Sequence, residues 1–233
     1  PILSFPRSVA FLLVACAGAS VALGEPVAGR GELIEGTSQP VARFYPGHFT
    51  DKDSVASIAL KRVFAKSREL PNNYAVKPLF EKLKDGRHRV RIDFPPGTSY
   101  YATGEVSGPL LRNGHTVTLW NTDAYGYDIT SPSLYQSHPW VLAVRPDGTS
   151  VGILLDTTWR TVINLDGAVE FTSEGNAAAI YVVDRAKPEE VSTGLMELTG
   201  NMPLPPKWAM VLSERARQLN SSAEPTASQV PSF

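Results

Sequence analysis

The fold of this chain is decided by residues 140–155, which read WVLAVRPDGTSVGILL. Two apolar runs, at 140–144 and 151–155, enclose a polar segment with Pro-Asp-Gly at 146–148. Proline fixes the backbone angle φ and glycine accepts a positive φ, so this tripeptide between apolar runs is typical of a β-hairpin turn. We therefore expect two neighbouring antiparallel strands at this point in the chain.

The same kind of pattern extends to both sides of the hairpin. In residues 88–94 the apolar side chains Val90, Ile92 and Phe94 alternate with polar ones, which is the period of a half-buried strand. Further short runs with strand character lie at 116–120, 161–165, 168–172 and 177–183. Strands in series, with a turn about every ten residues, predict a mainly β fold, namely an antiparallel β-sandwich.

One helix is predicted towards the C-terminal end, between Lys187 and Gly200. A proline and two glutamates open it, where the unpaired N–H groups and the helix dipole favour them. Val191, Leu195 and Leu198 fall on one face of this helix, and Gly200 is the expected stop. The fold class is thus a β-sandwich with one C-terminal helix.

Composition excludes several classes of function. The 233 residues are 42% hydrophobic and 19% charged, with a formal net charge of −1. A nucleic-acid partner is not expected, because it would require a basic excess. The single cysteine and the four scattered histidines show no zinc-ligand spacing, so we expect no metal and no other cofactor.

The first 24 residues predict a secretory signal peptide. Arg7 precedes an apolar run at 9–17, and small residues lead to Gly24. A buried strand or helix is the alternative. The Leu-Val-Ala-Cys that ends at Cys16 also resembles a bacterial lipobox, in which lipid would be attached to the cysteine. We therefore expect an exported protein, periplasmic or extracellular, that is either secreted or anchored to a membrane through Cys16.

The rest of the chain divides into three predicted segments. Residues 25–54 are rich in glycine, proline and serine without a clear period, so we expect a flexible leader. Residues 55–210 contain the periodic runs, with a first strand at 55–60, and form the predicted β-sandwich domain. Residues 211–233 are polar and are expected to form a disordered tail.

Three motifs, in order, resemble the N-terminal half of glycoside hydrolase family 31. Residues 101–110 (YATGEVSGPL) resemble the family's Tyr-Gly-x-Gly-Glu stretch. Residues 119–125 (LWNTDAY) and 134–140 (LYQSHPW) are similar to its Trp-Asn-x-Asp loop and to the Leu-Tyr-x-Ser-x-Pro-Phe strand that follows. Residues 198–209 (LTGNMPLPPKWA) resemble its Leu-Thr-Gly-x-x-x-Leu-Pro-Pro-x-Trp-Ala segment. The resemblance runs from about residue 89 to residue 209.

The resemblance implies a galactose-mutarotase-like β-sandwich followed by a (β/α)₈ barrel, in enzymes that cleave α-linked glucosides with retention. Such chemistry uses two carboxyl groups, which in this family are aspartates of the barrel. The family's Trp-x-Asp-Met-Asn-Glu nucleophile motif does not occur here, and the residues after Met210 depart from the family pattern. We therefore expect no catalytic residue and no barrel in this chain, as in a truncated gene or fragment, and no hydrolysis by the chain alone.

Asp123 is the main candidate for substrate binding. The resemblance implies that its loop reaches the mouth of the barrel and that its carboxylate binds hydroxyls near the +1 sugar. A carboxylate can accept hydrogen bonds from two adjacent hydroxyls, and these charge-assisted bonds are strong. The alternative is a turn aspartate that caps local N–H groups. Asn121 and Tyr125 flank it, and they either contact sugar or only shape the loop.

The tryptophans are assigned structural roles. Trp120 and Trp140 are interpreted as core residues of sandwich strands rather than as platforms for sugar rings. Trp159 follows a turn and is also interpreted as structural, and Trp208 would fill the joint between sandwich and barrel.

Besides a purely structural module without a ligand, two functions from different classes are compatible with these motifs. The first is an accessory β-sandwich that completes the +1 subsite of a retaining α-glucosidase. Its partners would be an α-glucoside or oligosaccharide substrate and a barrel that is normally part of the same chain. The alternative is a free-standing carbohydrate-binding sandwich without hydrolase activity.

Overall fold

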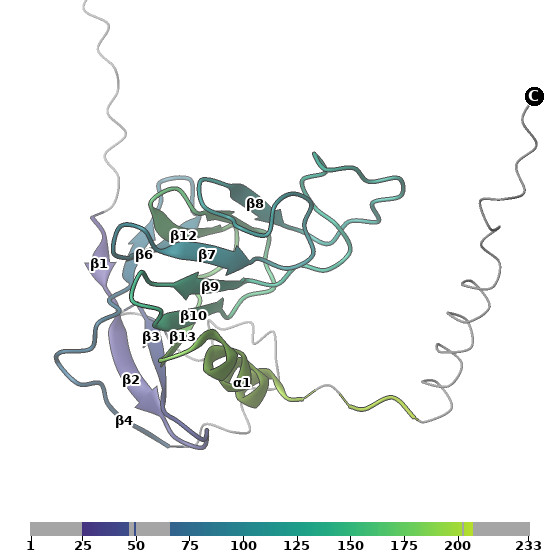
Figure 1. Cartoon of the computed structure of the whole chain (residues 1–233). Coiled ribbons are helices and arrows are strands. Elements are labelled where there is room, and N and C mark those ends of the chain that lie inside the picture. Colours follow the sequence, from purple (N-terminus) through teal and green to yellow (C-terminus); the bar gives the residue numbers. More distant parts are fainter. Residues whose placement is uncertain (1–24, 47–48, 50–65, 202, 207–233) are drawn as a thin grey trace, which may run out of the picture.

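A computed structural model of the chain describes residues 25–46, 49, 66–201 and 203–206 (Figure 1). Two antiparallel β-sheets and one helix make up this part of the chain. The six-stranded sheet contains, in spatial order, β1 (Val27–Ala28), β5 (Leu79–Lys82), β6 (His88–Asp93), β12 (Ala168–Ser173), β11 (Thr161–Asn164) and β8 (Thr116–Leu119). The seven-stranded sheet contains β4 (Ser67–Glu69), β2 (Arg30–Ile34), β3 (Val41–Tyr45), β13 (Ile180–Arg185), β10 (Ser150–Leu155), β9 (Trp140–Val144) and β7 (Ser99–Ala102). The predicted fold class is confirmed.

The hairpin predicted at 140–155 is formed by β9 and β10. The two strands pair antiparallel, with Val144 opposite Ser150. Arg145 donates its backbone N–H to the carbonyl oxygen of Thr149 at 2.8 Å, and Gly148 has a φ of 86°. The positive φ at Gly148 is the conformation that the sequence motif predicts for this turn.

The main core lies between the two sheets. Val90 and Ile92 of β6 point inward with exposed fractions of 4% and 1%, and the alternate side chains of this strand face outward. Facing them from the seven-stranded sheet are Ile153 and Val182, which are fully buried in the same cluster. This alternation is the burial that a two-layer sandwich requires.

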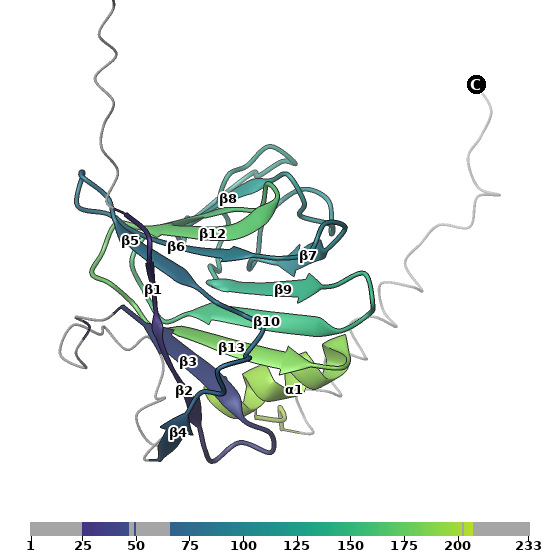
Figure 2. The same ribbon diagram turned by 90° about the vertical axis from the view of Figure 1, so that its left-hand side faces the viewer.

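A second, smaller core lies between the seven-stranded sheet and α1 (Pro188–Thr199), which covers β10 and β13 (Figure 2). Val191 and Leu198 bury one face of the helix against this sheet. The helix can approach the sheet closely at Gly194, where a Cβ atom would lie 2.5 Å from a methyl carbon of Val183 in β13. The helix ends as predicted at Gly200, which has a φ of 88° and donates its N–H to the carbonyl oxygen of Met196.

The prediction of a flexible leader at 25–54 is wrong for the residues that the structure describes. This segment supplies β1, β2 and β3, and Ile34, Val41 and Ala42 have no exposed surface. Composition misled here because the strands are at most five residues long and are separated by polar, glycine- or proline-containing segments. In addition, β13, a partner of β3, lies far away in the sequence. The sandwich therefore begins near Val27.

Several predictions fall on residues outside the described part of the chain. These are the signal peptide at 1–24 with Cys16, the first strand at 55–60, Trp208 and the tail at 211–233. Among the described residues, no helix is long and apolar enough to cross a bilayer.

Candidate functional site

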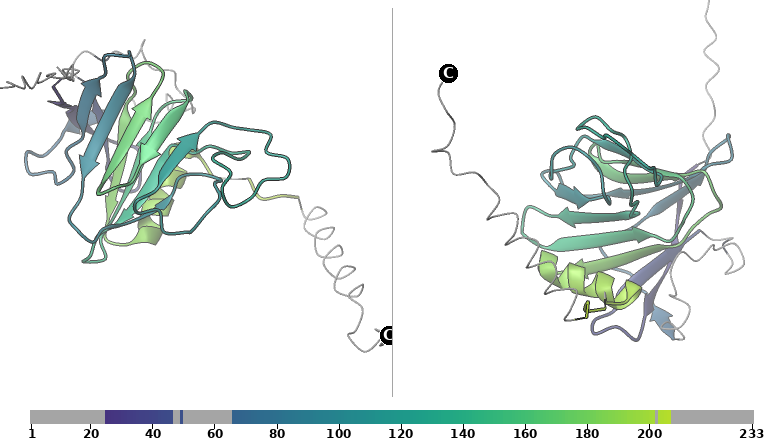
Figure 3. Two further views of the ribbon diagram at one scale, coloured as in Figure 1. Left: turned by 90° about the horizontal axis from the view of Figure 1, so that it is seen from above. Right: turned by 90° about the vertical axis from the view of Figure 1, so that its right-hand side faces the viewer.

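The candidate site is built on the β8–β9 loop, which comprises residues 120–139. It connects the edge strand of the six-stranded sheet to β9 of the other sheet. The loop projects beyond the strand ends of both sheets (Figures 1 and 3). Long loops on a rigid sandwich commonly carry binding residues, because the sheets hold their two ends in place.

Hydrogen bonds across the base of the loop hold its two halves together. The side-chain oxygen of Asn121 accepts the backbone N–H of Ser137 at 2.8 Å, and Thr122 donates its N–H to the carbonyl oxygen of Leu134 at 2.8 Å. Farther out, the Tyr135 hydroxyl donates to the carbonyl oxygen of Ala124 at 3.1 Å. Asn121 therefore shapes the loop in this structure, and its contact with sugar stays a prediction.

Asp123 differs from the other aspartate of the loop. Its side chain is exposed, and no hydrogen bond or ion pair joins it to the part of the chain that the structure describes. Asp128, by contrast, accepts both the hydroxyl and the backbone N–H of Thr130 at 2.7 Å, and these bonds lower the pKa of its carboxyl group. Asp128 is thus the turn-capping residue, whereas the carboxylate of Asp123 faces solvent.

The outer part of the loop presents aromatic side chains. Tyr125 is 98% exposed. Tyr127 is also exposed, and its ring meets that of Tyr135 edge-on, with 6.4 Å between the ring centroids. Exposed aromatic groups on a projecting loop are typical of a surface that meets a ligand or another domain.

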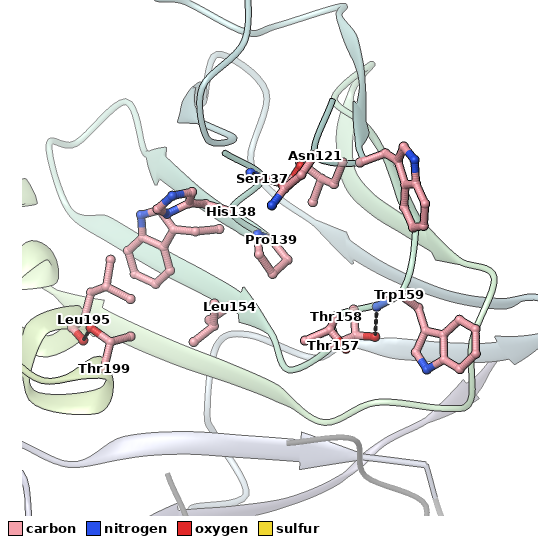
Figure 4. A pocket seen from close by; sticks show the side chains of 13 residues that line it. Asn121, Ser137, His138, Pro139, Leu154, Thr157, Thr158, Trp159, Leu195 and Thr199 are labelled. Atoms are coloured by element: carbon pink, nitrogen blue, oxygen red, sulfur yellow. Dashed lines mark hydrogen bonds between the residues drawn. The ribbon is translucent and has the colours of Figure 1, made fainter. Parts of the chain in front are cut away.

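A groove of about 710 Å³ opens beside the base of the loop (Figure 4). One wall comes from Trp120 and His138 of the loop, and another comes from Trp159, which follows β10. Leu195 and Thr199 of α1 line it as well. The volume lies in the range of small-molecule sites, which combine apolar walls with a few polar groups.

The structure separates the roles of the groove tryptophans. Trp140 is 9% exposed and packs over Gly152, which confirms its assignment to the core. The assignment of Trp120 to the core is wrong, since its side chain is 55% exposed. Leu119 takes the inward position at the end of β8, so alternation turns the next side chain outward.

Trp159 has a structural contact and an exposed face. Its ring lies against Gly175, where a Cβ atom would come within 2.1 Å of the ring. The backbone N–H of Trp159 donates to the hydroxyl oxygen of Thr157 at 3.2 Å (Figure 4). Yet Trp159 remains 49% exposed. The one sequence signal for its place in the groove is a tryptophan a few residues beyond the end of a strand.

The backbone of residues 102–105 runs against the end of the β8–β9 loop. Thr103 and Glu105 donate their N–H groups to the carbonyl oxygens of Trp140 and Gln136, both at 2.9 Å. A Cβ atom on Gly104 would lie 2.7 Å from the backbone nitrogen of His138, so only glycine fits there. Two of the sequence motifs are therefore packed together in space.

The described side chains also show whether a metal ion could be held. Within the described ranges, no three His, Cys, Asp or Glu side chains come together in a way that could hold a metal ion. What the site offers chemically is a solvent-facing carboxylate for hydroxyl groups, with aromatic surfaces beside it.

Comparison with known proteins gives a match over the region that contains this site. Residues 42–164, more than half of the chain, match the model of the "Glycosyl hydrolase 31 N-terminal galactose mutarotase-like domain". The chain is 41% identical over 115 residues to Alpha-glucosidase 2 of Bacillus thermoamyloliquefaciens, which covers 48% of this chain and 14% of that protein. This chain is also 24% identical over 130 residues to an alpha-xylosidase of Emericella nidulans, and the match covers 54% of this chain and 16% of that protein.

A solved structure shares the fold over a longer stretch. The GH31 dextranase of Flavobacterium johnsoniae, in complex with glucose, aligns with 86% of this chain and 32% of its own, at a TM-score of 0.58 and 17% identity. The present chain therefore spans only a small part of the length of each of these proteins.

Proposed function

Because the chain belongs to the family of glycosyl hydrolase 31 N-terminal galactose mutarotase-like domains, we propose that it is the accessory β-sandwich of a retaining α-glucosidase and that its β8–β9 loop completes the +1 substrate subsite. The proposal rests on the surroundings of the Asp123 carboxylate. Its carboxylate lies exposed on a projecting loop and has no partner within the described residues.

Asp123 suits the recognition of a sugar because a carboxylate accepts hydrogen bonds only. Two neighbouring hydroxyls of an α-glucoside can donate to its two oxygens, and bonds to a charged acceptor are shorter and stronger than neutral ones. Tyr125, which is 98% exposed, adds a ring that can pack on the sugar or on the barrel. This chain would bind and orient the substrate.

Hydrolysis itself would be the task of the barrel. A retaining glycosidase needs two carboxyl groups about 5–5.5 Å apart, one as nucleophile and one as acid and base. We assign neither role to a residue of this chain, and we expect the chain alone to be inactive on α-glucosides.

The groove supports docking of the barrel at this end of the sandwich. Trp120 and Trp159 are about half exposed, and Leu204, just beyond α1, is 90% exposed. Apolar surface of this kind is costly in water and marks an interaction site. The chain leaves α1 next to the groove, so a barrel that follows α1 in the family order would lie close to it.

The test begins with the DNA that follows the codon for Met210, read in all three frames. A Trp-x-Asp-Met-Asn-Glu motif in one frame would support the proposal, and the joined protein should then release glucose from maltose while the 233-residue chain does not. A locus that encodes no barrel in any frame, together with an inactive chain, would overturn the hydrolase role.

The second candidate function is a free-standing carbohydrate-binding sandwich, which is favoured by the two half-exposed tryptophans of the groove. Indole rings offer broad faces on which sugar rings can pack. Titration of the chain with maltotriose, followed by tryptophan fluorescence, distinguishes the two functions. A saturable change that Trp159→Ala abolishes would favour the binding module, and no change up to millimolar sugar would favour the accessory domain.

A further inference from the structure

We propose that Arg112 is a positioning residue for the β8–β9 loop: it fixes the turn at Val106 and Ser107, and Ser107 in turn holds the outer part of the loop at Asp128. The link to substrate rests on the function proposed above for Asp123, whereas the link between Arg112 and the loop does not.

The guanidinium group of Arg112 binds two successive carbonyl groups. Its Nη1 donates to the carbonyl oxygen of Ser107 at 2.9 Å, and its Nη2 donates to that of Val106 at 3.1 Å. The backbone N–H of Arg112 donates to the carbonyl oxygen of Tyr100 in β7 at 2.8 Å. One end of this residue is therefore fixed to the sheet, while the other end fixes the turn.

The free-energy cost of burying the Arg112 guanidinium group indicates that this residue does more than stabilise the fold. The residue is 8% exposed, burial lowers the pKa of its guanidinium group, and no carboxylate pairs with it in the described part of the chain. Its Nε is buried there without an acceptor. A buried charge in such surroundings costs free energy, and an apolar side chain of similar volume would pack more favourably.

An apolar residue cannot donate the two hydrogen bonds that Arg112 makes to these carbonyl oxygens. The planar guanidinium group holds two N–H directions in a fixed geometry, which fits two adjacent carbonyl oxygens, whereas the ammonium of lysine is a single point. The turn fits closely around it, since a Cβ atom on Gly108, which has a φ of 103°, would lie 3.3 Å from Nη1. The role of Arg112 therefore lies in the geometry that its guanidinium group imposes on the turn.

Ser107 passes this geometry on to the loop. Its hydroxyl donates to the carbonyl oxygen of Asp128 at 2.7 Å, across 21 residues of sequence. The bonds of Asn121 and Thr122 tie the loop at its base, and the Tyr135 hydroxyl ties it at Ala124. The Ser107 bond joins the outer part of the loop, which follows Asp123, to a segment outside the loop. Because an untethered loop samples many conformations, this bond limits the positions that Asp123 can occupy.

Hydrogen exchange in the 233-residue chain tests the proposal, with peptides that cover residues 122–134 as the readout. The variants are Ser107→Ala, Arg112→Met and Arg112→Lys. Ser192→Ala is the matched control, because that hydroxyl also donates to a carbonyl oxygen, but within α1 and not to the loop. We expect exchange in 122–134 to rise about fivefold in Ser107→Ala and at least as much in Arg112→Met, the effect of losing one intramolecular hydrogen bond or more.

The remaining outcomes decide the proposal. Exchange in β10 and β13 should stay unchanged in Ser107→Ala, and Arg112→Lys should restore only part of the protection that Arg112→Met loses. Unchanged loop exchange in Ser107→Ala would overturn the proposal, and this variant decides the matter if Arg112→Met does not fold. Asp123→Asn separates the two proposals, because it should leave loop exchange in this chain unaltered. If the same substitution in a protein that joins this domain to a barrel leaves oligosaccharide turnover unaltered, the subsite role fails while the positioning role of Arg112 stands.

Discussion

Thr103 donates its backbone N–H to the carbonyl oxygen of Trp140 at 2.9 Å, and this bond joins the 101–110 motif to the first residue of β9. To make the bond, the chain passes through two consecutive left-handed residues, Ala102 with a φ of 76° and Thr103 with a φ of 78°. A positive φ is costly for residues with a Cβ atom, and strain of this kind gathers where the surrounding structure demands it.

The strain at Ala102 predicts a stabilising substitution. Ala102 occupies the position of the first glycine in the family's Tyr-Gly-x-Gly-Glu stretch, and glycine adopts this φ without strain. Ala102→Gly relieves about 1 kcal/mol of strain and loses about half of that to the greater freedom of the unfolded chain. We expect urea unfolding to show a gain of about 0.5 kcal/mol. Ala143→Gly, at a fully buried strand position, should instead destabilise the chain, and a loss in both variants would contradict the interpretation.

Gly152 of β10 predicts a loss of stability on substitution. A Cβ atom at this position would lie 2.0 Å from the ring of Trp140 and 2.6 Å from a methyl carbon of Val191 in α1. Gly152→Ala should therefore cost about 1–3 kcal/mol, as overpacking of a core does. In a Trp140→Leu background the ring is absent, and the cost of the alanine should fall. A double-mutant cycle measured by urea unfolding checks this, and strict additivity would show that the ring is not the obstacle.

The elements that could be predicted from the sequence are those with local signals. The turn at Gly148 and the alternation of Val90 and Ile92 depend on neighbouring residues only, so the hairpin and β6 lie where they were expected. Strand β3 could not be found in this way, because Ala42 is buried through its pairing with Val182 of β13, far away in the sequence. A short strand of this kind is recognisable only by its tertiary partners.

The candidate site was predictable to a similar extent. The loop that carries Asp123 was located through its resemblance to a family motif. The groove could not be located, because Trp120, Trp159 and Leu195 come from three separate segments that meet only in the folded chain. Trp120 was misassigned because a position one residue beyond Leu119 has the opposite orientation, and the end of β8 cannot be fixed to one residue from the sequence.

Tyr74 predicts how stability depends on alkaline pH. Burial, and next the nearby carboxylate of Asp184, raise the pKa of the Tyr74 hydroxyl in the folded chain. An unfolded tyrosine has a pKa of about 10, so above this pH the unfolded chain loses a proton that the folded chain keeps. The free energy of unfolding must then fall as pH rises.

We expect Tyr74→Phe to weaken this fall in urea unfolding between about pH 9 and 11. Tyr127→Phe, at an exposed tyrosine, should leave the profile unchanged, and identical profiles for all three proteins would contradict the assignment.

The subsite role proposed for Asp123 makes the sharpest prediction. In a protein that joins this domain to its barrel, Asp123→Ala should raise KM for maltose and lower kcat/KM by about 10–100-fold, which corresponds to about 1.4–2.8 kcal/mol for the loss of charge-assisted bonds to two hydroxyls. Asp123→Asn keeps the shape and removes the charge, so it should retain part of the affinity.

The control for this prediction lies on the same loop. Asp128→Asn also removes a carboxylate, but that group is bonded to Thr130 within its own turn, so its loss should change kcat/KM by less than about threefold. Hydrolysis of p-nitrophenyl α-glucoside, whose leaving group has no hydroxyls to offer at +1, supplies a second comparison. If Asp123 acts at the +1 sugar, its substitution should impair maltose hydrolysis far more than hydrolysis of the aryl glucoside. Equal losses on both substrates would place the effect of Asp123 outside the +1 subsite, because an aryl group cannot donate the hydrogen bonds that its carboxylate would accept.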